Sequence, residues 1–317
     1  MSDRSESVDL KLIKNTNTID LTAETADDGK TCGDFLRGRG VSRRLTAKLK
    51  RVPGGITRSG CLIRTVDIVR AGDIISLKAE DERFTEPNGK LSAPVVYEDG
   101  DVIVFDKPAG MPVHPSAGHR GDTLGNFFAS LYPGLTFRPI NRLDKDTSGL
   151  CAAAKNPYAA SLLNGNISKT YFAVTEGRPV PPVKDVHTAN ESDGLLINWY
   201  ESSGGVYVID APIGRADASV VRRIVRADGK RAVTRYTILK GNNTHCLVRV
   251  VLETGRTHQI RVHFSSVGHP LAGDDFYGGG FGLCRRQALH CGEMRFFRPS
   301  DGKLTELFCD IPEDMQI

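Results

Sequence analysis

The chain has 317 residues, of which 39% are hydrophobic and 25% charged, an ordinary composition for a globular protein with a sizeable core. It contains no apolar run of about 18 residues, the length a membrane span needs, and its start lacks a signal-like apolar stretch. Its seven cysteines show no C-x-x-C spacing, which favours reduced thiols over disulfides or a zinc site. We therefore expect no membrane span, no metal and a cytoplasmic protein, with a monomer as the default.

The net charge of +4 is unevenly distributed. Residues 1–29 hold seven acids and three bases, whereas residues 30–78 hold twelve bases and only three acids. One short segment therefore carries the whole basic excess. Such an asymmetry predicts a polyanionic partner for that segment.

Residues 1–28 are polar, acidic and without strong periodicity, so we interpret them as a flexible tail with a short strand near Leu10–Ile13. The next segment, 29–79, predicts a compact basic module of two short helices followed by small strands. The first helix contains Phe35 and Leu36, and the second, Arg43 to Arg51, is capped by Ser42.

In the basic module, strands are predicted at 61–63 and 74–77, after a Pro-Gly-Gly run at 53–55. The second helix supplies candidate RNA contacts, namely Arg43, Arg44, Lys48 and Arg51. A helix face of arginines can follow phosphates, although a solvated basic helix without a ligand is the alternative. Phe35-Leu36, Val41-Ser42-Arg43 and the stretch 70–75 resemble the S4-like RNA-binding domain, which favours RNA binding.

Residues 80–93 are polar and contain Pro, Asn and Gly, which predicts a linker. The segment 94–317 then reads as a domain rich in strands. Strands are expected at 102–105, 150–154, 170–175, 206–209, 232–239 and 247–252. Helices are expected from Asn156-Pro157 to about Asn164 and from Thr257 to Gly268. Many strands and few helices predict an α+β fold with mainly antiparallel pairing.

The most informative string is Asn141-Arg142-Leu143-Asp144-Lys145-Asp146-Thr147-Ser148-Gly149-Leu150. From the residues alone it is a polar loop that ends in a strand. Asp144 and Asp146 could form an acid/base pair, but two turn-stabilising aspartates explain the same spacing. Spacing therefore does not choose between these interpretations.

Arg-Leu-Asp-x-x-Thr-Ser-Gly-Leu resembles the signature of RluA-type pseudouridine synthases. Three further stretches resemble that family in order and spacing: 97–115 with its Lys-Pro-Ala-Gly run, Lys169-Thr170-Tyr171, and 255–263 followed by 268–274. The resemblance covers roughly 94–312. Asn141 departs from it, because the family usually has His there; an Asn can hydrogen-bond the loop in a similar way.

The resemblance implies an enzyme that isomerises uridine to pseudouridine in a structured RNA, without a cofactor. It makes Asp144 the catalytic carboxylate, Arg261 the partner that keeps it ionised, and Tyr171 a residue that stacks on uracil or transfers a proton. A paired uridine must leave its stack to reach such a site. Arg142 is a candidate to fill the vacated space, with a phosphate contact as the alternative.

Other polar patterns predict less. His258 and His263 lie five residues apart, about 140° around a helix, so we expect capping or core roles for them and not a shared metal. We interpret the glycine-rich stretch 276–282 as a flexible loop and 121–124 as a helix cap. The S4-like module favours large-subunit ribosomal RNA as substrate, with transfer RNA possible. A non-catalytic RNA-binding or ribosome-assembly factor, or a DNA glycosylase, are the alternative functions.

Overall fold

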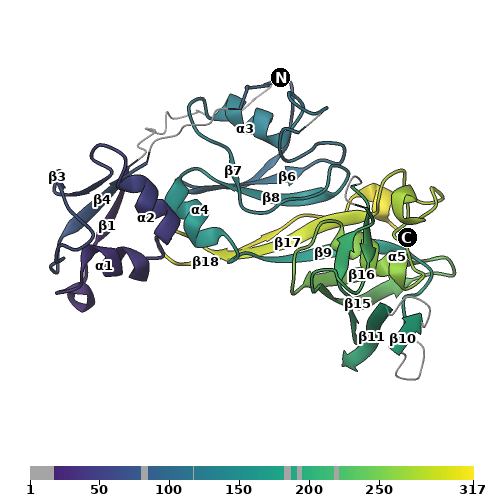
Figure 1. Cartoon of the computed structure of the whole chain (residues 1–317). Coiled ribbons are helices and arrows are strands. Elements are labelled where there is room, and N and C mark those ends of the chain that lie inside the picture. Colours follow the sequence, from purple (N-terminus) through teal and green to yellow (C-terminus); the bar gives the residue numbers. More distant parts are fainter. Residues whose placement is uncertain (1–17, 80–84, 117, 182–186, 191–194, 218–220) are drawn as a thin grey trace, which may run out of the picture.

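The computed structural model describes residues 18–79, 85–116, 118–181, 187–190, 195–217 and 221–317. They form a small N-terminal module and a larger domain built on one long sheet (Figure 1). The strand predicted near Leu10–Ile13 lies outside the described residues. No helix in the described part of the chain has the length and apolar character needed to cross a membrane.

The N-terminal module packs two short helices on a four-stranded antiparallel sheet of order β1-β4-β2-β3. Its elements are β1 (Thr18–Thr22), α1 (Cys32–Gly38), α2 (Arg43–Leu49), β2 (Ile56–Arg58), β3 (Cys61–Leu62) and β4 (Ile74–Lys78). The hydroxyl of Ser42 accepts a hydrogen bond of 3.2 Å from the backbone N–H of Leu45, so the predicted cap of α2 is confirmed.

The tail prediction for 1–28 is wrong for the described residues 18–22, because they form β1 and pair along the whole of β4. Ile19 and Leu21 pack against the module's core, while Thr18, Asp20 and Thr22 are exposed. The alternation of apolar and polar residues typical of a strand is only five residues long here, and it is hard to recognise in an acidic, polar segment. β2, which follows the Pro-Gly-Gly run, was also not predicted.

The larger domain is α+β and mainly antiparallel, as predicted. Its sheet order is β10-β11-β12-β15-β16-β9-β17-β8-β6-β5, with β18 on β17 and β7 on β8, and β13 pairs with β14 as a separate hairpin. The strands are β5 (Val95–Glu98), β6 (Val102–Lys107), β7 (Arg138–Pro139), β8 (Ser148–Ala154), β9 (Ser168–Glu176), β10 (His187–Asn190), β11 (Leu195–Ser203), β12 (Val206–Asp210), β13 (Ile213–Arg215), β14 (Arg223–Val225), β15 (Val233–Gly241), β16 (His245–Leu252), β17 (Leu289–Phe297) and β18 (Leu304–Phe308). The helices are α3 (Leu124–Leu131), α4 (Pro157–Leu163) and α5 (Gln259–Ser266).

The fully buried strand β8 lies between β17 and β6 in this sheet. Its partner β17 runs parallel to it, whereas the other strand pairs are antiparallel. Gly149 begins this contact with a φ of 105°, and a Cβ there would lie 2.4 Å from the carbonyl oxygen of Cys291. Only glycine permits that approach. The Thr-Ser-Gly run of the sequence is therefore the point at which the loop before β8 enters the core.

The module docks on the larger domain through α4 (Figure 1). The hydroxyl of Tyr158 donates to the carbonyl of Arg39 at 3.0 Å, and the hydroxyl of Ser161 donates to the carbonyl of Gly40 at 3.2 Å. Leu162 lies against Gly40, where a Cβ would come within 2.1 Å of its side chain. Direct contacts between folded surfaces therefore hold the two parts together.

The predicted linker, 80–93, is shorter than expected. The N–H of Asn88 donates to the carbonyl of Asn126 at 3.0 Å, and Ala93 lies in the core of the larger domain. Leu91 packs against the same core. The end of the predicted linker is thus part of the larger domain, because its apolar side chains have a surface on which to pack.

Candidate functional site

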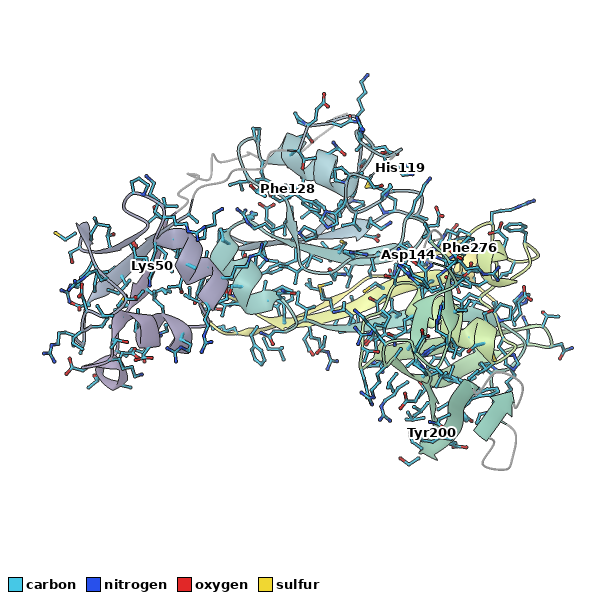
Figure 2. The ribbon with its side chains drawn as sticks, viewed as in Figure 1. Lys50, His119, Phe128, Asp144, Tyr200 and Phe276 are labelled. Carbon is cyan, nitrogen blue, oxygen red and sulfur yellow. The ribbon has the colours of Figure 1, made fainter. Side chains whose placement is uncertain are left out.

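Asp144 lies on the loop between β7 and β8, and Figure 2 shows it next to Phe276. Asn141 holds the start of this loop: its side chain donates to the carbonyl of Leu150 at 3.1 Å and accepts from the N–H of Ala152 at 2.8 Å. The predicted hydrogen-bonding role of Asn141 is therefore confirmed. The N–H of Thr147 donates to the carbonyl of Asp144 at 3.1 Å, which closes a tight turn around the carboxylate.

Lys107, at the end of β6, binds the backbone of the same loop. Its side chain is fully buried, and its Nζ donates to the carbonyls of Pro108, Met111 and Lys145 at 2.7, 2.8 and 2.9 Å. Three donors thus meet three acceptors, which suits an ammonium group. Burial lowers the pKa of Lys107 to about 8. The Lys-Pro stretch therefore acts as a clamp on the backbone next to Asp144.

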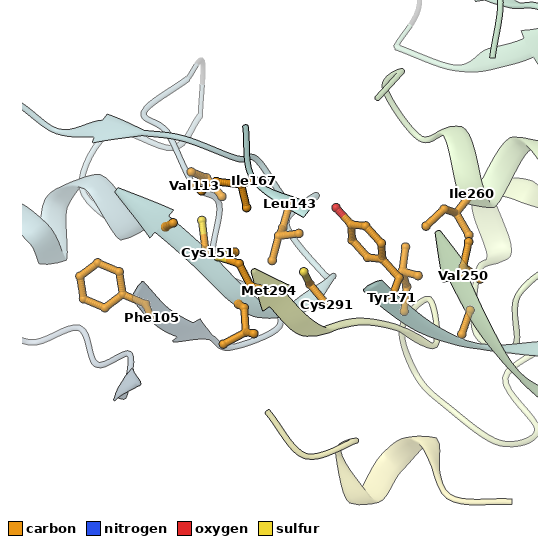
Figure 3. Packing of buried hydrophobic residues seen from close by; sticks show 14 of the residues in the cluster. Phe105, Val113, Leu143, Cys151, Ile167, Tyr171, Val250, Ile260, Cys291 and Met294 are labelled. Atoms are coloured by element: carbon orange, nitrogen blue, oxygen red, sulfur yellow. The ribbon is translucent and has the colours of Figure 1, made fainter. Parts of the chain in front are cut away.

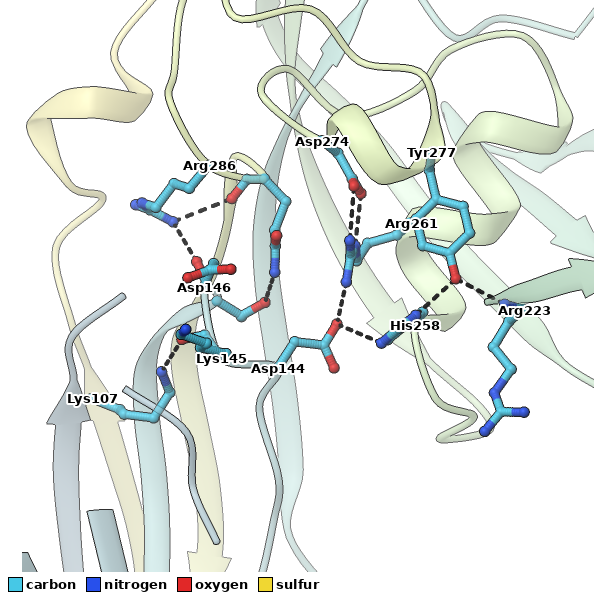
Figure 4. Close-up of polar contacts among 12 residues, drawn as sticks. Lys107, Asp144, Lys145, Asp146, Arg223, His258, Arg261, Asp274, Tyr277 and Arg286 are labelled. Carbon is cyan, nitrogen blue, oxygen red and sulfur yellow. Dashed lines mark hydrogen bonds and ion pairs between the residues drawn. The ribbon is translucent and has the colours of Figure 1, made fainter. Parts of the chain in front are cut away.

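The carboxylate of Asp144 meets the guanidinium of Arg261, which α5 supplies, at 3.0 Å (Figure 4). The other side of that guanidinium binds both oxygens of Asp274, at 2.7 and 2.8 Å. Asp274 is 1% exposed and Arg261 9%, whereas Asp144 is 27% exposed. Asp274 thus anchors Arg261 from the buried side and leaves Asp144 as the carboxylate that solvent and ligands can reach.

The charges of this network alternate in sign, because the guanidinium of Arg261 lies between the carboxylates of Asp144 and Asp274. Burial alone would lower the pKa of Arg261, but hydrogen bonds and the charges of Asp274 and Asp144 raise it above its ordinary value. The ring of Tyr277 covers the guanidinium, with 4.9 Å between the Cζ atom and the ring centre. Arg261 is therefore a permanent cation with a fixed orientation beside the carboxylate of Asp144.

Tyr171, on β9, lies beside Asp144 in the wall of the site. Its ring packs among buried residues that include Leu143 and Ile260, and Figure 3 shows these side chains around it. Burial raises the pKa of Tyr171 well above its usual range, and Cys291 and Asp144 raise it further. Its hydroxyl therefore remains protonated near neutral pH and serves as a hydrogen-bond donor.

His258, expected to have a capping or core role, belongs to the site. Its Nδ1 lies 2.7 Å from the hydroxyl of Tyr277, and its Nε2 lies 3.9 Å from the carboxylate of Asp144. It precedes α5 but makes no side-chain capping bond. His263 is the predicted core histidine: it is fully buried and bonded to Thr234 and to the carbonyl of Ala211, both at 2.9 Å.

The glycine-rich stretch 276–282, interpreted as a flexible loop, begins inside the site. Tyr277 ends a short 3-10 turn and is 5% exposed. Its hydroxyl accepts from the backbone N–H of Arg223 at 3.1 Å and contacts His258. The rings of Phe276 and Tyr277 stand edge-on to each other and to the imidazole of His258, so the start of this stretch is packed in the site.

The site opens into two adjoining cavities of about 70 and 450 Å³. Arg142, Leu143, Asp144, His258 and Arg261 line both of them. The larger volume lies in the range typical of small-molecule pockets. Arg142 is exposed at this opening, two residues from the carboxylate. The structure therefore brings together the sequence-predicted residues Arg142, Asp144, Tyr171 and Arg261.

A groove of about 620 Å³ continues from the site along the β13–β14 hairpin. Arg256 lines both this groove and the smaller cavity beside Asp144. Five cationic and two acidic side chains line the groove: Arg215, Arg223, Arg226, Lys230 and Arg256, with Asp217 and Asp228. The groove therefore has an excess of positive charge directly beside the carboxylate.

The four candidate RNA-contacting residues of α2 lie in the other half of the molecule. Arg43, Arg44 and Arg51 are exposed, and Lys48 is half-buried. Lys50, at the end of the same helix, marks this surface in Figure 2, well separated from Asp144. They are not part of the carboxylate site. A single ligand that contacts both places must be large.

Several site residues were missed by sequence reasoning, namely Lys107, His258, Asp274 and Tyr277. All four stand in or next to the motifs of the sequence. Their positions in or near the motifs could have indicated a role in the site. Their contacts, however, join residues that are distant in the sequence: Arg261 and Asp274 are thirteen residues apart, and Lys107 and Lys145 are thirty-eight apart. Motif membership alone did not reveal these pairs.

Comparison with known proteins agrees with this geometry. Residues 101–266 match the family model for RNA pseudouridylate synthase. A ribosomal large subunit pseudouridine synthase D of Pseudomonas aeruginosa is 36% identical over 285 residues, which cover 82% of each chain. An RNA pseudouridine synthase of Bacillus subtilis is 33% identical over 298 residues, 90% of this chain and 96% of that one.

Among solved structures, the human RNA pseudouridylate synthase domain containing 1 is 25% identical, with a TM-score of 0.52. The match covers 71% of this chain and 86% of that one. The family model spans the loop of Asp144, β9 and α5. The chain therefore belongs to the RNA pseudouridylate synthase family and is a pseudouridine-forming isomerase.

Proposed function

We propose that this isomerase modifies uridines of large-subunit ribosomal RNA and that Asp144 is its reacting carboxylate. The observation that carries the proposal is the 3.0 Å contact of a partly exposed Asp144 with a buried Arg261 at the floor of an open cavity. Relatives that bear the name ribosomal large subunit pseudouridine synthase D support the choice of RNA.

The reaction explains why one ionised carboxylate is sufficient. The N1–C1′ glycosidic bond of uridine breaks, the uracil turns over, and C5 bonds to C1′. The proton of C5 is lost and N1 gains one, so that atoms and electrons balance without a redox partner or group donor. Asp144 can attack the substrate or abstract a ribose proton while positive charge develops on the sugar.

Arg261 and Tyr171 take the two supporting roles in this proposal. Arg261 places a permanent positive charge 3.0 Å from the carboxylate of Asp144 and orients it. Tyr171, protonated because of its burial, offers a ring on which uracil can stack and a hydroxyl that can donate to it. The same burial argues against Tyr171 as a proton acceptor at neutral pH.

The RNA reaches the site by extrusion of one nucleotide, at a cost of about a few kcal/mol. Arg142, exposed at the mouth of the cavity, can fill the vacated stack with its planar guanidinium. The basic groove at β13–β14 and the exposed arginines of α2 can hold phosphates at two separate places. In this proposal residues 18–79 act as an S4-like RNA-docking module of a monomeric cytoplasmic enzyme.

Transfer RNA is the alternative substrate, and a non-catalytic RNA-binding factor is the alternative function. The buried Arg261–Asp274 pair speaks against pure binding, because orienting a cation toward a partly exposed carboxylate serves chemistry more than docking. A DNA glycosylase would share base flipping, but the family assignment disfavours it.

The proposal is tested by mapping pseudouridine with carbodiimide in RNA from a strain that lacks the gene. Complementation with the wild-type chain should restore one or a few sites in large-subunit ribosomal RNA, whereas Asp144→Asn should restore none. Sites restored only in transfer RNA would correct the substrate. Unchanged uridines in both RNA classes would contradict the proposed activity.

A further inference from the structure

His258 has an unusual backbone conformation for a residue with a Cβ. It lies immediately before α5 with φ 57° and ψ 20°, in the left-handed region. Among the described residues, Ser59 alone shares a positive φ without being a glycine. L residues rarely adopt this conformation, so the surrounding structure must impose it, and such positions cluster at functional sites.

The surroundings of His258 fix both ends of its side chain (Figure 4). Nδ1 lies 2.7 Å from the hydroxyl of Tyr277, which in turn accepts from the N–H of Arg223 at 3.1 Å. Nε2 points to Asp144, with 3.9 Å between the nitrogen and Oδ2. The rings of Phe276 and Tyr277 stand edge-on to the imidazole. Through the hydroxyl of Tyr277, the side chain of His258 thus connects β14 with the reacting carboxylate.

These contacts select one tautomer of the imidazole. Burial raises the pKa of Tyr277, so that its hydroxyl keeps its proton and can donate it to Nδ1. The remaining hydrogen of a neutral imidazole is then on Nε2, and it faces a carboxylate that can only accept. Burial lowers the pKa of His258; the charge of Asp144 opposes that shift and the charge of Arg261 adds to it, so the ring is neutral near pH 7.

Arg261 and His258 approach the same oxygen of Asp144. The guanidinium contact of 3.0 Å and the imidazole contact of 3.9 Å both end on Oδ2. Among the described residues, the hydrogen bond to Asp144 ends on Oδ2, and none reaches Oδ1. One carboxylate oxygen is therefore oriented by the protein, and the other is available to a substrate.

We propose that His258 is a positioning residue that, together with Arg261, holds Oδ2 of Asp144 and presents Oδ1 to the uridine. The inference rests on the proposed role of Asp144 as the reacting carboxylate. The 3.9 Å separation is longer than a hydrogen bond. We expect it to shorten in the complex with RNA, because catalytic contacts are commonly long in unliganded sites. Because Arg223 lines the basic groove, RNA bound there reaches the same chain of contacts through Tyr277.

Two substitutions of His258 separate positioning from a merely structural role. His258→Asn suits a left-handed backbone, but its side chain is too short to reach Asp144. His258→Gln has the length to place an amide N–H near the position of Nε2. In the full-length chain with a large-subunit RNA transcript, His258→Asn should lower kcat by about 10- to 100-fold with KM nearly unchanged, and His258→Gln should recover part of that loss.

Two companion variants make the result interpretable. Tyr277→Phe keeps the ring over Arg261 but removes the hydroxyl that holds Nδ1, and it should lower kcat by a smaller factor. His245→Asn is the matched control, since His245 contacts Thr244 at the start of β16 and has no part in the site. It should leave both constants unchanged.

Three outcomes would overturn the inference. The first is a wild-type kcat in His258→Asn, and the second is a change in that variant confined to KM. The third is an equal loss of kcat in His258→Asn and His258→Gln, accompanied by an equal loss of thermal stability. The result is distinguishable from failure of the proposed function. An active His258→Asn beside an inactive Asp144→Asn rejects only the positioning role, whereas an active Asp144→Asn rejects the proposed reaction itself.

Discussion

The carboxylate site and the surface of α2 hold their charged side chains in opposite ways. In the larger domain, Arg261 and Asp274 are almost fully buried and are bound to each other through two hydrogen bonds. In the N-terminal module, Arg43 and Arg44 of α2 and Arg51, two residues after its end, are exposed to solvent. Buried charges interact strongly and are little screened by salt, whereas exposed ones interact weakly and are screened.

This difference separates two kinds of function. A buried network fixes a single geometry, so that losing one member should affect the chemical step or the fold as a whole. Exposed bases contribute separately to the attraction of a polyanion, and their loss should be graded and dependent on salt. The predictions below test this contrast, beginning with the largest expected effect.

Asp144→Asn should abolish turnover, with kcat lowered by at least about 10³-fold and RNA affinity nearly unchanged, because the amide carries no negative charge to react. The release of hydrogen from C5 of labelled uridine measures the rate. Asp146→Asn is the control: Asp146 contributes its backbone carbonyl to Arg286, which the substitution retains. Similar losses in the two variants would assign the chemistry to the loop as a whole.

Asp274→Asn should destabilise the larger domain by about 3–5 kcal/mol, since it leaves the buried Arg261 without its bidentate partner. Urea unfolding measures the change. In Asp301→Asn, which breaks the more exposed pair with Arg298, the unfolding midpoint should barely move. A midpoint that shifts equally in both variants would remove the distinction between buried and exposed charge.

His263 should make the larger domain sensitive to acid. Burial lowers its pKa from 6.5 to about 4, so the unfolded chain takes up a proton in this interval and the native chain does not. The stabilisation from its neutral form is complete above pH 6.5 and is lost as pH falls to 4, on the order of 3 kcal/mol. His263→Gln should flatten unfolding free energy against pH; an unchanged slope would place the titration elsewhere.

Replacing Arg43, Arg44 and Arg51 by alanine should raise KM about tenfold at moderate salt and leave kcat unchanged. The dependence of log KM on log salt should become shallower by roughly one unit for each phosphate that the helix no longer binds. Assays between about 50 and 200 mM salt measure it. Arg37→Ala, which removes an exposed arginine paired with Asp34, is the control. A salt dependence equal to that of the wild type would deny α2 a role in RNA binding.

The sequence by itself determined the elements with strong local signals and the family. Ser42 capping α2, Asn156-Pro157 opening α4 and the run of β6 follow from neighbouring residues, so they were predictable without a fold. The motifs also identified Asp144, Tyr171 and Arg261 as a set. Local patterns did not predict β1, because its strand conformation depends on pairing with β4.

Only the tertiary structure decided how the site is organised. Asp144 and Arg261 are separated by 117 residues, and their contact depends on the pairing of β16, β9, β17 and β8. The bidentate anchor at Asp274, the clamp by Lys107 and the left-handed His258 arise from packing between distant segments. Sequence spacing specifies neighbours along a helix or strand, but the burial that gives these charges their strength exists only once the chain has folded.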